Sequence, residues 1–478
     1  MKVEWYAVLV AGVGILLWLR GAVLGSALSV LFFSLFSGGA ALILGHSTVT
    51  PVSFAIIFLL AHLILSLFKR TTHLKIGLTV NLFIIIYCSY GAMTAYLLPK
   101  IFYRAMAVPP LLQNGQHTFY VSNVLHYSPQ NLTTAIYLLG TLLAAVAGGA
   151  ASADPNSRRA LVTWGLVIAW VQTAFGLLGI VPGASAIIKL FRNATYAELV
   201  QTTTGGYSRI SGISPEPSAY AAYAFFWFVL MTELWLRDVR PRLTGATAFA
   251  LGLLIAACTS TTGYASIAVY AVIMLGRFVI APRSLRISKA IPIVMIGLVG
   301  AVAALAAFNL SSHLAFVVGH VLQQLTVGKA DTQSGQQRLY WAATAIKAFR
   351  VTWGLGIGAG SFRSSSLLLA IMGSTGVIGL TAFLAHFFKI LKPLRRDTYD
   401  LPGDPNKAIA VAAAWTACAG LIPQLISFPT PDPSYLFGIV GGLALGWRRV
   451  PRTRRAPATG RLSLMPKRSP GIPTLAEW

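Results

Sequence analysis

Residues Pro51 to Phe68 read PVSFAIIFLLAHLILSLF, an apolar run that contains one histidine and no charged residue. Its length approaches the roughly 20 residues that an α-helix needs to cross the hydrocarbon core of a bilayer. Two other runs, Ala22–Leu44 and Ala290–Leu310, exceed that length. Hydrophobic residues make up 56% of the 478-residue chain and charged residues only 10%, whereas a soluble domain carries about 25% charged residues. The sequence therefore predicts an all-α polytopic membrane protein.

The apolar runs define the expected organisation of the chain. We expect about 12–13 transmembrane helices, over the ranges 5–19, 22–45, 51–68, 77–98, 132–150, 160–182, 218–235, 243–258, 264–281, 290–310, 365–388, 407–426 and 434–447. Residues 1–447 would form the bundle, and residues 448–478 a basic cytoplasmic tail that lies disordered against anionic headgroups. Arg20 interrupts the first run and another run follows, so we interpret the N-terminus as a retained helix and not a signal peptide.

The basic residues are distributed unevenly over the loops. Lys and Arg gather in alternate loops, near residues 69–75, 158–159, 237–242, 277–289 and 389–407, and in the tail. Because cytoplasmic loops hold such an excess, the C-terminus is predicted inside. The loops 99–131, 183–217 and 311–364 are then predicted at the periplasmic face of a bacterial inner membrane. The net charge of +25 follows this topology, so we expect no nucleic-acid partner.

The cysteines give no sign of a disulfide or a metal site. Cys88, Cys258 and Cys418 each lie within or beside an apolar run, and no Cys/His cluster has the spacing of metal ligands. The predicted outer loops hold only Glu198, Glu216, Asp331 and Asp432 besides Glu4, so we expect no metal, and we expect no cofactor.

Three arginines stand out in the predicted periplasmic loops: Arg209, Arg338 and Arg363. A guanidinium fork binds two phosphate oxygens at once and stays charged. Arginines at the outer face of a membrane bundle therefore indicate an anionic headgroup ligand, and a lipid-linked pyrophosphate fits well. The alternative interpretation is that they anchor helix ends to ordinary lipid headgroups.

Several outer residues are candidates for a catalytic base. Glu216 precedes Pro217 and Ser218, which suit the first positions of a helix, so Glu216 is either a helix cap or a functional carboxylate. Asp331 lies seven residues before Arg338. His313 and His320 lie in an amphipathic stretch, residues 312–325, where they could act as a base or as interfacial polar groups. A more distant carboxylate, Glu233, is expected to pair with Arg237 four residues on.

Glycines recur at alternate positions in a segment that follows Arg338. Residues Gly354–Arg363 read GLGIGAGSFR, and alternating glycines allow a backbone to approach another group closely. The stretch breaks the spacing of a dinucleotide fingerprint and lacks its strand–turn–helix context, so we exclude a nucleotide site. The turn Ser260-Thr-Thr-Gly263 offers hydroxyls for a sugar or for a helix cap.

Taken in order, two of these patterns resemble the Wzy-type polymerases of O-antigen and exopolysaccharide, in the membrane family that also includes the O-antigen ligases. The first pattern is Arg209-x-x-Gly212 followed by Glu216-Pro217-Ser218. The second comprises Arg338, Trp341, Gly356-Ile-Gly358-Ala-Gly360, Ser366 and Gly376-Val-Ile-Gly379. The chain departs from the arginine-plus-ten-glycine pattern of some polymerases, which puts an alternating-arm mechanism in doubt.

The resemblance implies a GT-C-like bundle that works without nucleotide or metal. It implies transfer of a glycan from undecaprenyl pyrophosphate to the non-reducing end of a lipid-linked repeat unit at the periplasmic face. A chain-length regulator and a flippase are the expected partners. Arg209, Arg338 and Arg363 would hold the pyrophosphate, and Glu216, Asp331 or His320 would act as base. A ligase, with His313 or His320 as the ligase histidine, a flippase and a non-catalytic assembly subunit remain the alternatives.

Overall fold

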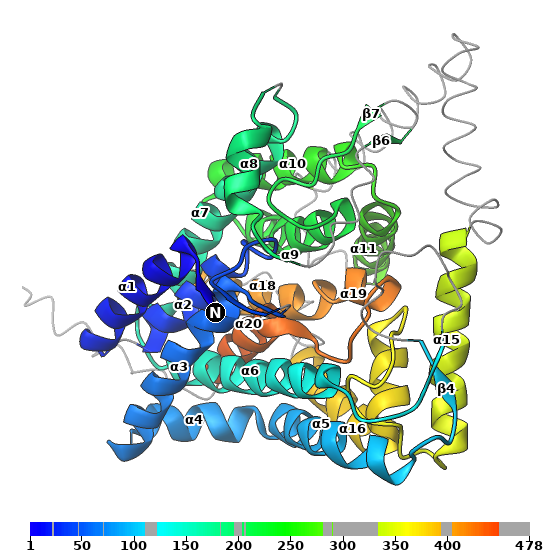
Figure 1. Cartoon of the computed structure of the whole chain (residues 1–478). Helices are drawn as coiled ribbons and strands as arrows, with labels where there is room; N and C mark the ends of the chain where they lie inside the picture. Colours follow the sequence, from blue (N-terminus) through cyan, green and yellow to red (C-terminus); the bar gives the residue numbers. More distant parts are fainter. Residues whose placement is uncertain are drawn as a thin grey trace, which may run out of the picture.

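The fold is described from a computed structural model of the chain. The described residues are 1–21, 23–45, 47–69, 71–109, 122–181, 183–195, 203–204, 207–280, 289, 333–392 and 404–448. Most of them are helical (Figure 1). The helices are α1 (Trp5–Leu19), α2 (Val23–Phe33), α3 (Pro51–Phe68), α4 (Thr72–Val80), α5 (Leu82–Ile101), α6 (Pro129–Ala151), α7 (Ser157–Leu178), α8 (Ser185–Phe191), α9 (Pro217–Leu236), α10 (Pro241–Ala257), α11 (Thr261–Ile280), α15 (Gln333–Val351), α16 (Leu367–Leu391), α18 (Pro405–Ala419), α19 (Ile422–Ile426) and α20 (Ser434–Gly446).

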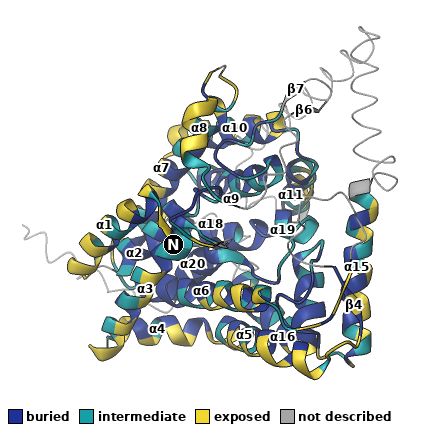
Figure 2. Cartoon of the chain, in the orientation of Figure 1, coloured by how far each residue is buried: buried dark blue, intermediate teal, exposed yellow. Residues whose placement is uncertain are grey.

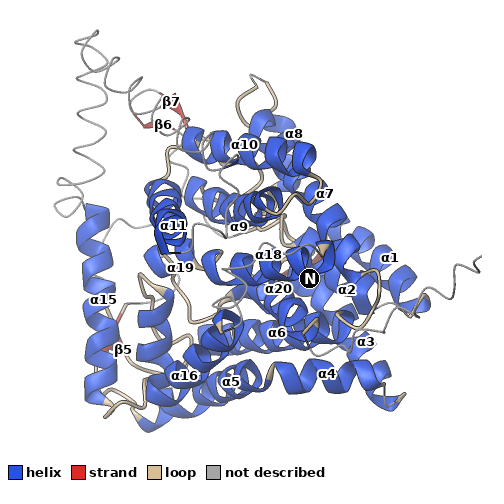
Figure 3. Cartoon of the chain, turned by 180° about the vertical axis from the view of Figure 1, so that it is seen from behind, coloured by secondary structure: helices blue, strands red, loops and turns tan. Residues whose placement is uncertain are grey.

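Strands are few and short (Figure 3). Strands β1 (Lys2–Val3), β2 (Leu42–Leu44) and β3 (Ser47–Val49) form one antiparallel sheet in the order β1-β2-β3. Two hairpins pair β4 (Ala107–Val108) with β5 (Asn123–Val124), and β6 (Thr203–Thr204) with β7 (Tyr207–Ser208).

Within the described ranges, eight helical segments are long and apolar enough to cross a membrane. They are α3, α5, α6, α7, α9, α11, α16 and the pair α18–α19, and the shorter apolar helices are α1, α2, α10 and α20. The outer helices α1, α4 and α5 carry exposed faces, whereas α9, α18 and α20 are largely buried (Figure 2). This arrangement agrees with the predicted all-α polytopic membrane protein.

Three predicted spans differ from the observed helices, and one of them, 407–426, is divided between α18 and α19. The span predicted over 22–45 is wrong in its second half, because α2 ends at Phe33 and the chain turns into β2. Gly38 and Gly39 lie at this turn. The Ala40 N–H donates to Asn193 Oδ1 at 2.7 Å and not to the carbonyl four residues earlier, as it would in a helix. The span predicted over 77–98 is interrupted at Asn81, whose Nδ2 donates to Gly77 O and Ala145 O at 2.9 and 2.7 Å. The predicted span 290–310 lies outside the described residues.

Small residues bring the central helices together. A side chain at Gly148 would collide with the backbone of Ile439 in α20, and one at Gly442 would collide with the backbone of Ala145 in α6. Membrane helices pack closely where glycine removes the side chain, because apolar burial provides no drive between helices in lipid. The tight α6–α20 pair therefore forms the centre of the bundle, and α15 stands at its edge beside α16 (Figure 3).

Candidate functional site

The loop between α15 and α16, residues 352–366, contains four glycines with left-handed backbone, and we call it the glycine loop. The φ angles of Gly354, Gly356, Gly358 and Gly360 are +83°, +84°, +95° and +86°. A residue with a Cβ atom adopts such angles only at a cost in free energy. The alternating glycines of the sequence thus specify a backbone path that most other residues would oppose.

The same glycines let this loop thread between three helices. A Cβ atom at Gly356 would lie 2.5 Å from Ser374 O of α16, and one at Gly360 would lie 2.5 Å from Gln130 O of α6. At Gly358 it would lie 2.7 Å from Thr94 O of α5. The close approach predicted from the glycines is therefore made to the backbone of the bundle itself.

Hydrogen bonds fix the loop in this position. The Ile357 and Gly358 amides donate to Gly373 O and Ser374 O, both at 2.9 Å. Asn131, which is fully buried in α6, donates from Nδ2 to Ala359 O at 2.9 Å. Backbone groups bonded on several sides have little freedom to move, so the residues at the end of the loop are held rigidly.

Arg363 lies at the end of this loop. Its amide donates to Pro109 O at 3.1 Å, and the next amide, that of Ser364, donates to Pro429 O at 3.1 Å. The guanidinium carbon lies 4.7 Å from the centre of the Trp341 ring in α15. A cation over an indole face is attracted by the ring quadrupole. Trp341 thus orients a guanidinium that is already fixed at its backbone.

Arg338 and Glu216 join Arg363 in one electrostatic cluster, which we call the arginine cluster. Burial lowers the pKa of Arg338 and of Arg363, and the charge of Arg338 lowers the pKa of Arg363 further. The Glu216 carboxylate acts in the opposite direction on the pKa of both arginines. Arginine stays protonated despite such shifts. Two guanidinium cations and one carboxylate therefore influence one another here, which leaves an excess of positive charge in a partly buried region.

Glu216 occupies the N-cap position of α9, but its side chain makes no capping hydrogen bond. Its Oε1 instead accepts a hydrogen bond from Ser218 Oγ at 2.5 Å. The Glu216 side chain therefore does not cap α9, and its charge acts on Arg338 and Arg363.

The segment before Glu216 is held by another arginine. Arg192 donates from Nη2 to Pro215 O at 3.2 Å and from Nη1 to Ser211 Oγ at 3.5 Å. Gly212 has φ +50° and passes against Tyr220, whose ring would lie 3.1 Å from an added Cβ atom. These contacts set the direction in which the chain enters α9. No local pattern in the sequence indicated that Arg192 has this role.

Arg209 has a different partner from the other two arginines. Its Nε donates to Thr259 Oγ1 at 3.2 Å and its Nη2 to Thr259 O at 3.1 Å. Thr259 begins the turn before α11, where Ser260 Oγ accepts a hydrogen bond from the Gly263 amide at 3.4 Å. The Ser260–Gly263 turn thus caps a helix, one of its two predicted roles. The structure brings Arg338, Arg363 and Glu216 together and ties Arg209 to the α10–α11 turn.

The remaining predicted site residues, Asp331, His320 and His313, lie outside the described residues. One carboxylate that the sequence did not single out is Asp432, which is buried in the loop between α19 and α20. It accepts hydrogen bonds from Thr141 Oγ1 at 2.6 Å and from the Ser434 amide at 3.3 Å. Burial raises its pKa to about 7. The same loop provides the Pro429 carbonyl that binds the Ser364 amide.

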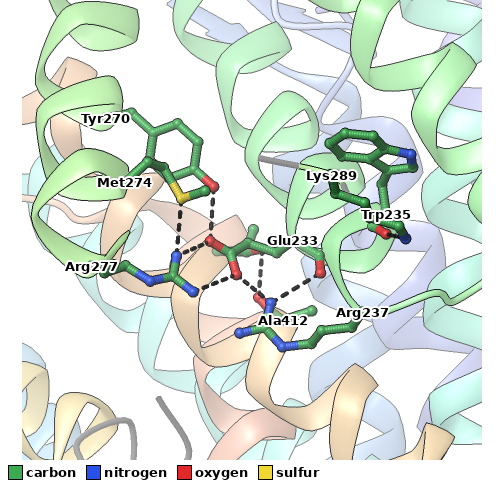
Figure 4. Close-up of polar contacts among 9 residues, drawn as sticks. Glu233, Trp235, Arg237, Tyr270, Met274, Arg277, Lys289 and Ala412 are labelled. Carbon is green, nitrogen blue, oxygen red and sulfur yellow. Dashed lines mark hydrogen bonds and ion pairs between the residues drawn. The ribbon is translucent and has the colours of Figure 1, made fainter. Parts of the chain in front are cut away.

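A second charged cluster lies at the opposite end of α9 (Figure 4). The predicted pair is confirmed, with Arg237 Nη1 2.5 Å from Glu233 Oε2. Glu233 also accepts from Arg277 Nη1 at 2.5 Å and from Tyr270 OH at 2.8 Å, and the Arg277 guanidinium lies 3.9 Å from the Trp415 ring centre. Since Glu233 follows Glu216 by 17 residues of sequence, the two clusters are separated by roughly 25 Å along the helix. The Glu233 cluster therefore links helices and is not part of the arginine cluster.

No group of three or more His, Cys, Asp or Glu side chains suited to a metal ion occurs in the part of the chain that the structure describes. The sequence matches no protein-family model and has no significant match among curated proteins.

Proposed function

We propose that this protein is a Wzy-type polysaccharide polymerase, a membrane glycosyltransferase that uses undecaprenyl-pyrophosphate-linked repeat units. It would act at the periplasmic face of a bacterial inner membrane, in a GT-C-like bundle. The observation that supports the proposal is the arginine cluster, where two partly buried guanidinium groups and a carboxylate from different elements act on one another. A diphosphate with a transferable sugar has the complementary charge.

In the proposed reaction, the bond between the donor sugar C1 and the pyrophosphate oxygen breaks, and its electron pair leaves with the pyrophosphate. The acceptor hydroxyl oxygen forms a new bond to C1 and loses its proton to a base. Negative charge develops on the leaving oxygen, and fixed donors stabilise such charge without having to reorganise. Arg363 is suited to this role because Trp341 and the glycine loop already hold it in place.

Glu216 is the described residue best suited to accept the proton. It lies within electrostatic reach of both arginines, so a base and an anion site would stand side by side. Ser218 would orient the carboxylate through its hydrogen bond. Asp331 and His320 stay alternative bases. Arg209 keeps a proposed part in pyrophosphate binding through Nη1, because its Nε and Nη2 bond to Thr259.

The experiment compares variants in cells that depend on this gene for long polysaccharide. Arg338→Ala and Arg363→Ala should each lower polymer formation by about 10²–10³-fold, the usual cost of losing one fixed donor. Arg350→Ala is the matched control, because Arg350 is exposed at the other end of α15. Membrane levels of all variants are measured by immunoblot. Full-length polysaccharide from both cluster variants would exclude the proposed pyrophosphate site.

The form of the accumulated glycan separates the alternative functions. Loss of a polymerase leaves single repeat units, whereas loss of an O-antigen ligase leaves lipid-linked polymer. Loss of a flippase traps units on the cytoplasmic side, and an assembly subunit would tolerate both arginine substitutions. Reconstitution with a synthetic pyrophosphate-linked repeat then tests the polymerase directly, through products longer than one unit.

A further inference from the structure

A small cavity lies at the end of α6 that is remote from the arginine cluster. It has a volume of about 120 Å³ and is bordered by the end of α3, the α1–α2 turn, the start of α4 and Ala150 of α6. Ala150 follows Gln130, which contacts the glycine loop, by 20 residues, so roughly 30 Å of helix separates the two sites. The charge pattern predicts that this end faces the cytoplasm.

The lining of the cavity is basic. Among the described residues that line it, the ionisable side chains are His62, Lys69 and His73, and none is acidic. Lys69 and His73 are exposed at the mouth, whereas His62 is 1% exposed. His62 Nδ1 shares a hydrogen bond with Ser26 Oγ at 2.6 Å. Thr71 and His73, at the N-terminus of α4, also line the cavity, so the positive end of that helix dipole borders it. Such a lining suits an anion that carries phosphate oxygens.

An apolar groove adjoins this cavity. It has a volume of about 450 Å³ and shares Thr71 and Leu74 with the cavity. Leu67, Leu78 and Leu82 line it and are 60%, 45% and 53% exposed. An acyl chain is the complement of such a surface in a membrane protein, because leucine side chains and lipid tails are equally apolar.

We propose that the cavity and the groove together bind one anionic phospholipid, with its phosphate against Lys69 and His73 and an acyl chain along Leu67, Leu78 and Leu82. The groove alone would accept any lipid, but the basic cavity selects for negative charge. A free phosphate would use the cavity and leave the groove unused. The site is distinct from the arginine cluster and does not depend on the proposed function.

The test uses the full-length protein in detergent with native mass spectrometry, and phosphatidylglycerol and phosphatidylcholine as probes. The wild-type protein should retain phosphatidylglycerol in preference to phosphatidylcholine. Lys69→Gln should lower this retention by about fivefold, since one basic residue near an anionic lipid contributes about 1 kcal/mol. Lys189→Gln, which removes an exposed charge from α8, should leave retention unchanged.

A second variant tests whether the lipid occupies the cavity, by filling part of the cavity with a larger side chain. Ser66→Leu fills part of the cavity without changing a charge and should also lower phosphatidylglycerol retention, while a single symmetric gel-filtration peak shows that the protein remains folded. Equal retention of the two lipids, or no effect of Lys69→Gln, would overturn the proposal. Displacement of phosphatidylglycerol by millimolar inorganic phosphate would also overturn it, in favour of a small-anion site.

Discussion

The guanidinium carbon of Arg363 lies 4.7 Å from the centre of the Trp341 ring, which joins the loop before α16 to the face of α15. Arg338 precedes Trp341 by three residues in the same helix, and side chains with this spacing share a helix face. Trp341 therefore contacts Arg363 and shares a face of α15 with Arg338. An aromatic ring in this position helps to orient the Arg363 guanidinium.

Replacing Trp341 should impair the cluster without removing its charge. Trp341→Ala removes a cation–π contact of up to about 2 kcal/mol, which would lower the rate of the proposed polymerisation by up to roughly 30-fold. Trp341→Phe keeps a ring and should retain most of the activity. The measurement is chain elongation on a synthetic lipid-linked repeat. Equal rates for the alanine and phenylalanine variants would show that the ring does not orient Arg363.

If Glu216 is the base of the proposed reaction, removing its charge should stop proton transfer while sparing the fold. Glu216→Gln keeps the size of the side chain, and loss of a general base costs about 10²–10⁴-fold in rate. Ser218→Ala removes only the hydrogen bond to Oε1 and should cost less than tenfold. Rates are measured over a range of pH at equal protein levels. A fully active Glu216→Gln enzyme at every pH would assign the base to Asp331 or His320 instead.

A side chain at Gly358 should destabilise the protein. Gly358→Ala places a Cβ atom at φ +95° and 2.7 Å from Thr94 O, so we expect a loss of at least about 2 kcal/mol in stability. Gly12→Ala is the matched control, because no atom lies within 4 Å of an added Cβ and φ is not positive there. That change should stabilise α1 by about 0.5–1 kcal/mol. Thermal unfolding in detergent, followed by tryptophan fluorescence, measures both.

Neutralising Glu233 should have a larger effect than breaking an exposed ion pair. Glu233→Gln leaves Arg237 and Arg277 buried without their carboxylate, and such a loss costs about 3–5 kcal/mol. Lys2 pairs with Glu4 but is 73% exposed, so Lys2→Gln should hardly change the unfolding temperature. Similar unfolding temperatures for the two variants would contradict the structural role of the Glu233 cluster.

Asp432 should make stability fall as pH rises. Its pKa is raised to about 7 in the folded protein, so between its ordinary pKa and pH 7 the folded state binds a proton that the unfolded state has lost. Stability then decreases with increasing pH across this interval. Asp432→Asn cannot ionise and removes this contribution. The difference in unfolding temperature between the two proteins, measured from pH 5 to pH 8, should therefore move in favour of the variant as pH rises.

Features set by local pattern were predictable from the sequence. The bounds of α3 coincide with the apolar run at residues 51–68, and the Glu233–Arg237 pair follows from spacing along one helix. The end of α2 at Phe33 was not predictable, because it depends on Asn193, which binds the Ala40 amide from far along the chain.

The site shows the same division between local and distant contacts. The sequence identified Arg338, Arg363 and Glu216 as candidates. It could not show which of the three candidate arginines belong to the same cluster, because that depends on contacts between distant segments. Arg363 joins Arg338 because a buried asparagine of α6 and the Pro429 carbonyl hold the loop before α16. Arg277 was missed as a partner of Glu233 for a similar reason, since 44 residues separate them.

The path of the glycine loop restricts how this protein can diverge over evolution. Mutations at Gly356, Gly358 and Gly360 would displace neighbouring backbone and not merely side chains, so neighbouring substitutions offer little compensation. Related chains with altered specificity should therefore vary at the residues around these three positions and keep the glycines. A library of variants selected for altered products would enrich substitutions elsewhere in the outer loops.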